Sequence, residues 1–198
     1  MSPTEVNPDR PRWDEIWAHH LGINTSLAIL QATVLTGDSD ITHEGLVAFA
    51  MMTEDEVRAH VDQLRDEHEL GVVLLLIAAF EAALRADVHE RRRKGKRKRE
   101  PNRTFRELLR RHPSGERLPL DELLDVWRGH LDGEGKRRIV SEFKQVLEIR
   151  HWLAHGRWWI ERDFGALASP LLVRDRGVAL LEALELLEPE GDDGADAT

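Results

Sequence analysis

The stretch that decides the fold reads Leu-Gly-Val-Val-Leu-Leu-Leu-Ile-Ala-Ala-Phe-Glu-Ala-Ala-Leu and occupies residues 70–84. It is apolar except for Glu81, and it is shorter than the roughly 20 residues that cross a bilayer as a helix. We therefore predict a helix buried in a soluble domain, with no membrane partner. A carboxylate inside such a run is costly unless it is paired, so Glu81 is expected to have a buried partner.

The residues around this run extend it into a long helix. Thr53 and Glu56 have the three-residue spacing of a capping box, in which each side chain satisfies a backbone donor at a helix start. Apolar positions at helical spacing then lead into the run. We expect a break near Gly71, after which the helix resumes and ends near Arg92.

Helical periodicity also dominates elsewhere. Thr104 and Glu107 form a second capping box, and Gly156 is placed to stop a helix. Further helices are predicted over residues 13–35, 42–52, 104–111, 121–131, 136–155 and 174–187. The sequence thus predicts an all-α fold, a helical bundle of four to five main helices with short accessory helices. A single domain over residues 1–187 suffices, and the acidic, Gly-rich tail at 188–198 is expected to be disordered.

Charge is distributed very unevenly along the chain. The net charge is −9, yet residues 91–111 hold twelve Lys or Arg against two Glu, a local balance of +10. A basic strip on an acidic body can bind a polyanion locally, which makes RNA a candidate partner. The alternative is a solvated loop without a ligand.

Two absences narrow the class of protein. The chain has no cysteine, which excludes disulfides and thiolate metal sites. The first residues lack the basic-then-apolar pattern of a secretory signal. A cytoplasmic location is therefore predicted.

The residues that carry chemistry lie near the end of the helix predicted over 136–155. Arg150 is followed five positions later by His155. A guanidinium grips phosphate oxygens in a two-pronged geometry, and an imidazole exchanges a proton near neutral pH. Cleavage of RNA by its own 2′-OH needs a base at the hydroxyl and a cation at the phosphate, and it needs no metal.

The spacing poses a geometric problem. Residues five apart lie roughly 140° apart around a regular helix, so Arg150 and His155 do not share a face. Either the last turn unwinds at Gly156, or two chains pair so that their motifs line one cleft. We favour a two-fold homodimer, because a C₂ axis brings the same motif together twice.

These residues resemble a known family. The string Ile149-Arg150-His151-Trp152-Leu153-Ala154-His155-Gly156 is similar to the RX4–6H motif of HEPN domains, in which Asn is commonest where this chain has His151. Upstream, Ala79-Phe80-Glu81-Ala82-Ala83-Leu84-Arg85 resembles the Phe-Glu segment on an earlier helix of such domains. The resemblance covers roughly residues 70–159.

The resemblance implies a HEPN-like helical bundle, usually dimeric, and a metal-independent endoribonuclease that leaves a 2′,3′-cyclic phosphate. Arg150 and His155 would be the catalytic pair, Glu81 would orient Arg150 or the partner motif, and His151 would support the site. The basic strip is not a feature of that family. Its charge, not the resemblance, makes a basic set the candidate for binding the RNA backbone: Arg157, Arg91, Arg92, Arg93, Lys94, Lys96, Arg97, Lys98 and Arg99. Small nucleases of this kind are often toxins or phage-defence effectors, so a neutralising antitoxin is a further expected partner.

Plainer interpretations stand beside these. Arg150 and His155 are also explained by a surface ion pair and a helix-end His stabilised by the helix dipole. His151 and His155, four apart, have a zinc-binding spacing, but no third ligand is evident nearby, so no metal or other cofactor is expected. A non-catalytic HEPN-like module that holds RNA or a protein is the rival function. The nearby Trp152 is expected to pack in a core or interface in preference to stacking on bases.

Overall fold

The computed structural model describes residues 12–37, 47–93, 101–112, 118–153 and 168–186. Within these ranges the protein is helical and has no strand, which confirms the all-α prediction. The elements are α1 (Trp13–Thr36), the 3₁₀-helix η1 (Ala48–Met51), α3 (Glu54–Arg93), α4 (Asn102–Arg111), α5 (Leu120–His130), α6 (Glu134–His151) and α7 (Pro170–Ala183). The predicted acidic tail and residues 42–46 of a predicted short helix lie outside the described ranges. No described helix is long and apolar enough to cross a membrane.

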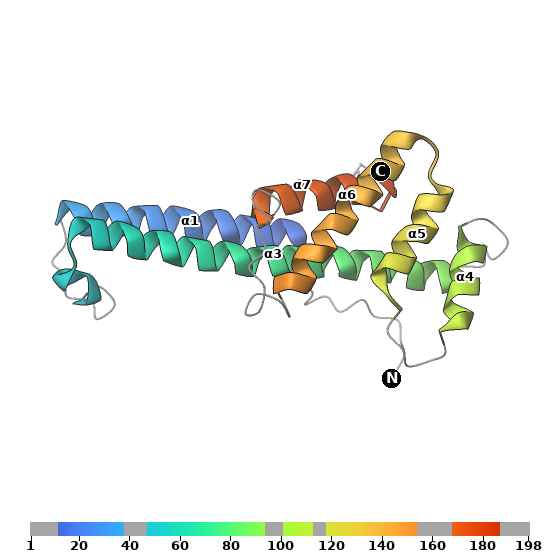
Figure 1. Ribbon diagram of the computed structural model, residues 1–198, viewed down its shortest axis with the longest axis horizontal. Helices are drawn as coiled ribbons and strands as arrows, with labels where there is room; N and C mark the ends of the chain where they lie inside the picture. Colours follow the sequence, from blue (N-terminus) through green and yellow to red (C-terminus); the bar gives the residue numbers. More distant parts are fainter. Residues whose placement is uncertain (1–11, 38–46, 94–100, 113–117, 154–167, 187–198) are drawn as a thin grey trace, which may run out of the picture.

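The molecule has a narrow part and a broad part, both threaded by α3 (Figure 1). We call the narrow part the stalk: α1 from His20 onward lies along residues 54–69 of α3, with η1 at the tip. We call the rest the head, in which α4, α5, α6 and α7 gather around the second half of α3. With 40 residues, α3 is about 60 Å long and connects the two parts.

The predicted break near Gly71 is wrong, because α3 runs through this position without interruption. A glycine inside a helix costs about 1 kcal/mol relative to alanine. Here Val72 and Val73 directly follow it, and both are buried in the core of the head. Burial of these and later side chains along one continuous helix outweighs the local cost.

One predicted capping box is confirmed and the other is wrong. The backbone N–H of Thr53 donates to the Glu56 carboxylate at 2.7 Å, and the Thr53 hydroxyl accepts from the Glu56 N–H at 3.4 Å. By contrast, α4 begins at Asn102, so Thr104 lies inside the helix. Its hydroxyl contacts His130 Nε2 at 3.4 Å, and this tertiary contact replaces the cap.

The core of the head forms where α5, α6 and α7 pack on α3 and on one another. Fully buried side chains come from five helices, α3 to α7; the largest are Phe80, Phe105, Phe143, Leu76, Ile77, Leu84, Leu123, Leu124, Ile149 and Leu180. At Gly177, α7 approaches α3 so closely that an added Cβ would overlap the ring of Phe80. A glycine is required at this contact.

The last helix begins four residues before the predicted start at Arg174. The Ser169 hydroxyl accepts a hydrogen bond from the Leu172 N–H at 3.2 Å, and Pro170 occupies the first helical position. Ser followed by Pro is a strong start signal that the apolar periodicity alone did not reveal.

Candidate functional site

Glu81 is a carboxylate buried in the head and held by two arginines. Only 5% of the residue is exposed. Its Oε1 accepts from Arg85 Nε at 2.9 Å and pairs with Arg85 Nη2 at 2.8 Å. Its Oε2 lies 3.2 Å from Nη1 of Arg150. The carboxylate in the apolar run therefore has the partners that its burial requires.

Helix geometry explains one of these pairs and tertiary packing explains the other. Arg85 is four residues after Glu81 on α3, the spacing at which side chains on a helix surface meet. Arg150 comes from the last turn of α6, which packs against α3 through the buried Ile149. The contact thus joins the end of α6 to the middle of the apolar helix.

The two arginines differ in how many other contacts their guanidinium groups make and in how exposed their side chains are. Arg85 also donates Nη1 to the Leu118 carbonyl at 2.9 Å, which ties it to the segment before α5, and its side chain is 25% exposed. The Arg150 side chain is 43% exposed. A guanidinium has five N–H donors, and among the described residues Glu81 is the ion-pair partner seen for Arg150.

The charges of this cluster do not cancel. Two guanidinium groups share one carboxylate, which leaves an excess of one positive charge, and the more exposed group is Arg150. The buried carboxylate of Glu81 holds one end of the Arg150 guanidinium, and the Arg150 side chain is 43% exposed. Such an arrangement can bind an anion in two-pronged fashion.

The backbone changes its winding directly after Arg150. Residues Trp152 and Leu153 form a π-helical turn, and the Trp152 N–H donates to both the Glu148 and the Ile149 carbonyls. Such widened turns are rare and occur frequently at functional sites. His155 and Gly156 lie outside the described residues, as does Arg157. His151 is exposed on the last turn of α6.

The predicted basic strip is only partly described. The Arg91 guanidinium is engaged internally: Nε donates to the Asp87 carboxylate at 2.7 Å, and the group lies 4.5 Å above the ring of Trp127. The Arg91 side chain therefore packs against the head in addition to forming an ion pair. Arg92 and Arg93 lie in the last turn of α3. Lys94, Lys96, Arg97, Lys98 and Arg99 fall outside the described residues.

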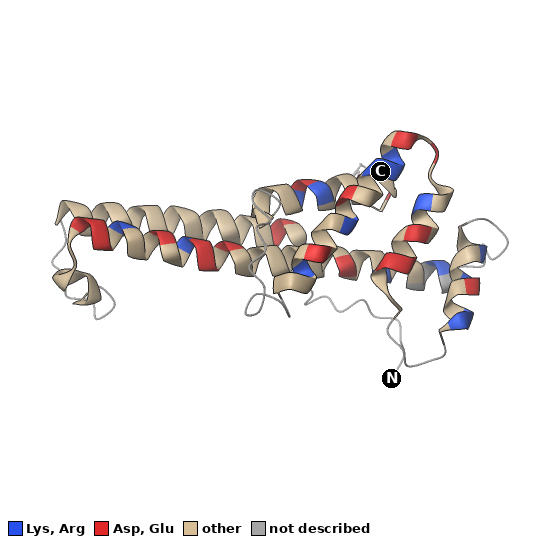
Figure 2. Cartoon of the chain, viewed as in Figure 1, with Lys and Arg blue, Asp and Glu red and all other residues tan. Residues whose placement is uncertain are grey.

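The structure adds basic residues that the candidate set did not include. Arg110 and Arg111 are exposed at the end of α4, and no ion pair to either is seen in the described part of the chain. Figure 2 shows this basic end of α4 at the margin of the head. Arg85 was also missed as a site residue, although its four-residue spacing from Glu81 is visible in the sequence.

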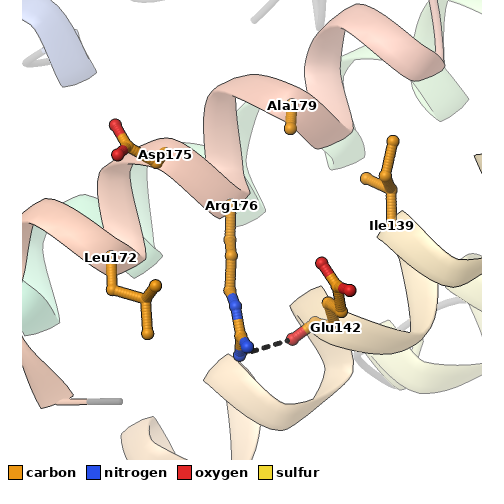
Figure 3. Close-up of a pocket in the computed structure, with 6 residues that line it drawn as sticks. All are labelled: Ile139, Glu142, Leu172, Asp175, Arg176 and Ala179. Atoms are coloured by element: carbon orange, nitrogen blue, oxygen red, sulfur yellow. Dashed lines mark hydrogen bonds between the residues drawn. The ribbon is translucent and has the colours of Figure 1, made fainter. Parts of the chain in front are cut away.

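A separate hollow lies between α6 and α7 (Figure 3). It has a volume of about 310 Å³ and is lined by Ile139, Glu142, Leu172, Asp175, Arg176 and Ala179. Arg176 is tied down there, since it donates to the Glu142 carbonyl at 3.3 Å. The hollow is open and includes neither Glu81 nor Arg150, so we place the candidate site at the arginine–carboxylate cluster.

No protein-family model, curated protein or solved structure matches the chain. Among the described residues, no group of three His, Asp or Glu side chains is placed to hold a metal ion.

Proposed function

We propose that the protein is a metal-independent endoribonuclease of the HEPN type. The observation that carries the proposal is the half-exposed Arg150, anchored to the buried carboxylate of Glu81 at 3.2 Å. In the proposed reaction the ribose 2′-OH attacks the adjacent phosphorus and the 5′-oxygen leaves. The products are a 2′,3′-cyclic phosphate and a free 5′-hydroxyl.

Arg150 is the proposed electrostatic group. It binds the scissile phosphate and stabilises the extra negative charge of the pentacoordinate transition state, while Glu81 holds the guanidinium in place. Removing one such fixed donor from an active site typically costs about 10²–10³ in rate. Arg85 is a positioning residue in this scheme, because its guanidinium satisfies the other oxygen of Glu81.

His155 is the proposed base toward the 2′-OH or acid toward the leaving oxygen. A regular helix would hold it about 140° away from Arg150. His155 lies outside the described residues, so its proposed role rests on the sequence motif. His151, exposed at the helix end, is proposed to support the site, and two copies of the chain remain one way to unite the pair.

The basic residues are proposed to bind the RNA backbone. Arg157 and the strip from Arg92 to Arg99 are the sequence candidates, and Arg110 and Arg111 extend them onto α4. Arg91 is less suited, since Asp87 and Trp127 already occupy its guanidinium. A toxin or phage-defence role in the cytoplasm, restrained by a neutralising protein, fits this chemistry and is part of the proposal.

The test measures cleavage of RNA by purified protein in EDTA. Wild type is compared with Arg150→Ala, His155→Ala and a matched control, Arg176→Ala, whose arginine is half-buried on α7 and donates to the Glu142 carbonyl. We expect a loss of about 10²-fold or more for the first two and no loss for the control. Mass spectrometry of the products should show the cyclic phosphate. Equal cleavage by all four proteins would refute the proposal.

The second candidate is a non-catalytic module that binds RNA or a protein. It is favoured by the same ion pair, because a guanidinium paired with Glu81 at a helix end also stabilises the fold by itself. The two candidates separate in a binding assay. If the protein is a binding module, wild type forms no product at any concentration and His155→Ala keeps the RNA affinity of wild type. If it is a nuclease, wild type forms product and His155→Ala binds RNA without cleaving it.

A further inference from the structure

The stalk half of α1 carries no formal charge. From Leu21 to Gly37 there is no Asp, Glu, Lys, Arg or His, although 33% of the chain is charged and about six charged residues would be expected in 17. Figure 2 shows this part of α1 without red or blue, beside the charged bands of α3. An uncharged helix surface has no charged group to desolvate when another surface covers it.

Only one side of this helix is covered. Leu27, Leu30 and Val34 pack with Phe49 and Val61 in the small core of the stalk. The opposite side is exposed in the described part of the chain, and eight residues along it are Ala18, Leu21, Gly22, Thr25, Ala28, Ile29, Ala32 and Thr36. Among them Leu21 is 50% exposed and Ile29 is 61% exposed. We call these eight residues the open face of α1.

The open face consists of rows of residues seven apart, which lie on one side of an α-helix. Ala18, Thr25 and Ala32 form one row, Leu21 and Ala28 a second, and Gly22, Ile29 and Thr36 a third; all of them are exposed. A seven-residue repeat is the pattern by which one helix packs along another in a left-handed supercoil. Small side chains in these rows allow close approach of the two backbones. The pattern therefore calls for a helix as the occupant.

Charge selects which helix this is. Residues 54–69 of α3, which lie along α1 in the stalk, hold seven acidic and two basic residues, a net charge of −5. A basic partner helix would be drawn to these residues and away from the uncharged face. An anionic membrane would be repelled by them. A second copy of this chain, itself at −9, can approach closely only where neither surface is charged.

We propose that the open face of α1 binds the same face of a second copy, so that two stalks form a four-helix bundle. A C₂ contact requires a self-complementary surface, which a face without charge provides. The inference does not rest on the ribonuclease proposal. Arg150 lies on α6, which packs chiefly on α3, α5 and α7, so substitutions in the open face leave the arginine–carboxylate cluster untouched.

The first test is the mass in solution, by light scattering across a concentration series. Wild type is expected at twice 22.7 kDa, or 45.4 kDa. Ile29→Glu places like charges in the contact twice and should raise the dimer dissociation constant at least about 100-fold. The matched control is Leu171→Glu on α7, whose leucine is 53% exposed against 61% for Ile29; it should remain dimeric. A wild type that stays at 22.7 kDa, or an Ile29→Glu protein that stays dimeric, would overturn the proposal.

The second test does not require a disruptive variant. The chain has no cysteine, so a single introduced thiol reports one position only. Thr25 is central in the row from Ala18 to Ala32, so its two copies meet whether the helices run parallel or antiparallel. Thr25→Cys should form a disulfide-linked dimer under mild oxidation, because linkage needs Cα atoms within about 7 Å. Asp62→Cys on the exposed flank of α3 is the control, and equal linkage of both would overturn the proposal.

Discussion

The stalk and the head share one helix, α3, and differ in how much side-chain burial supports it. Among the described residues of the stalk, three apolar side chains are buried, those of Phe49, Val57 and Val61. In the head the main core cluster holds 24 buried apolar residues of the described chain, drawn from α1 and from every helix after η1. Because tertiary packing supplies most helical stability in proteins, the same helix should be far more stable at its second half than at its first. Four predictions test this difference.

The largest expected effect comes from removing a buried ring in each part. Phe80 is fully buried between α3, α6 and α7, so Phe80→Ala should lower the free energy of unfolding by about 3–5 kcal/mol. Phe49→Ala in the stalk should lower the global value much less, because a thinly packed segment can open on its own. Chemical denaturation measures the global value, and hydrogen exchange measures the local opening of residues 54–69.

The measurement is made in the Ile29→Glu background, so that a second copy does not cover the stalk. We expect the amides of residues 54–69 to exchange faster than those of residues 72–88 even before either phenylalanine is changed. Equal losses of global stability from Phe49→Ala and Phe80→Ala would show that stalk and head unfold as one unit, and the proposed difference would then be wrong.

The next largest change in stability is expected from substitution of two glycines, Gly177 on α7 and Gly71 on α3. An added methyl group at Gly177 would overlap the ring of Phe80, so Gly177→Ala should destabilise the head by about 1–3 kcal/mol. At Gly71 on α3 there is open space, and Gly71→Ala should stabilise the helix by about 0.5–1 kcal/mol. Thermal unfolding midpoints that shift in opposite directions would support both assignments. A neutral Gly177→Ala would contradict the close approach of α7.

Sequence reasoning succeeded where the determinants are local. The start of α3 follows from Thr53 and Glu56, three residues apart, and the extent of α1 follows from its apolar spacing. It failed at Thr104, whose hydroxyl contacts His130, 26 residues away. Nothing in a local pattern reveals that competing partner.

The residues of the candidate site also differ in whether local sequence reveals their contacts. The burial of Glu81 implied a partner, and Arg85 could have been named from its four-residue spacing. Arg150 lies 69 positions further along the chain, and only the packing of α6 on α3 brings it to the carboxylate. The membership of the site therefore depends on tertiary structure even though each residue type was informative alone.

A smaller effect is expected from the histidines at the junction of stalk and head. His20 Nδ1 lies 3.2 Å from His68 Nε2, between α1 and α3. Burial and the neighbouring His68 lower the pKa of His20, while Glu69 opposes the shift. Burial and the nearby His19 lower the pKa of His68. Both rings therefore favour the neutral form in the folded protein.

The sign of the pH dependence follows from linkage. A folded pKa below the unfolded value of about 6.5 means that the unfolded state binds more protons, so stability is full above that pH and falls as the pH drops below it. We expect the unfolding midpoint to decrease between pH 7 and pH 5, and His68→Gln to show a shallower decrease. A variant with an unchanged or steeper profile would rule out this pair as a source of the pH dependence.

The smallest effects come from one helix cap in each part. The Ser169 hydroxyl caps α7 in the head, and the Thr53 hydroxyl caps α3 at the far end of the stalk. Each cap should contribute about 1 kcal/mol to its own helix end. Ser169→Ala should lower the global free energy of unfolding by that amount, because α7 is part of the main core. Thr53→Ala should instead speed hydrogen exchange near Glu56 and leave the global value unchanged, since the stalk opens before the head unfolds. If both variants lower the global free energy of unfolding equally, the stalk unfolds together with the head. The small number of buried side chains in the stalk would then not lead to local opening.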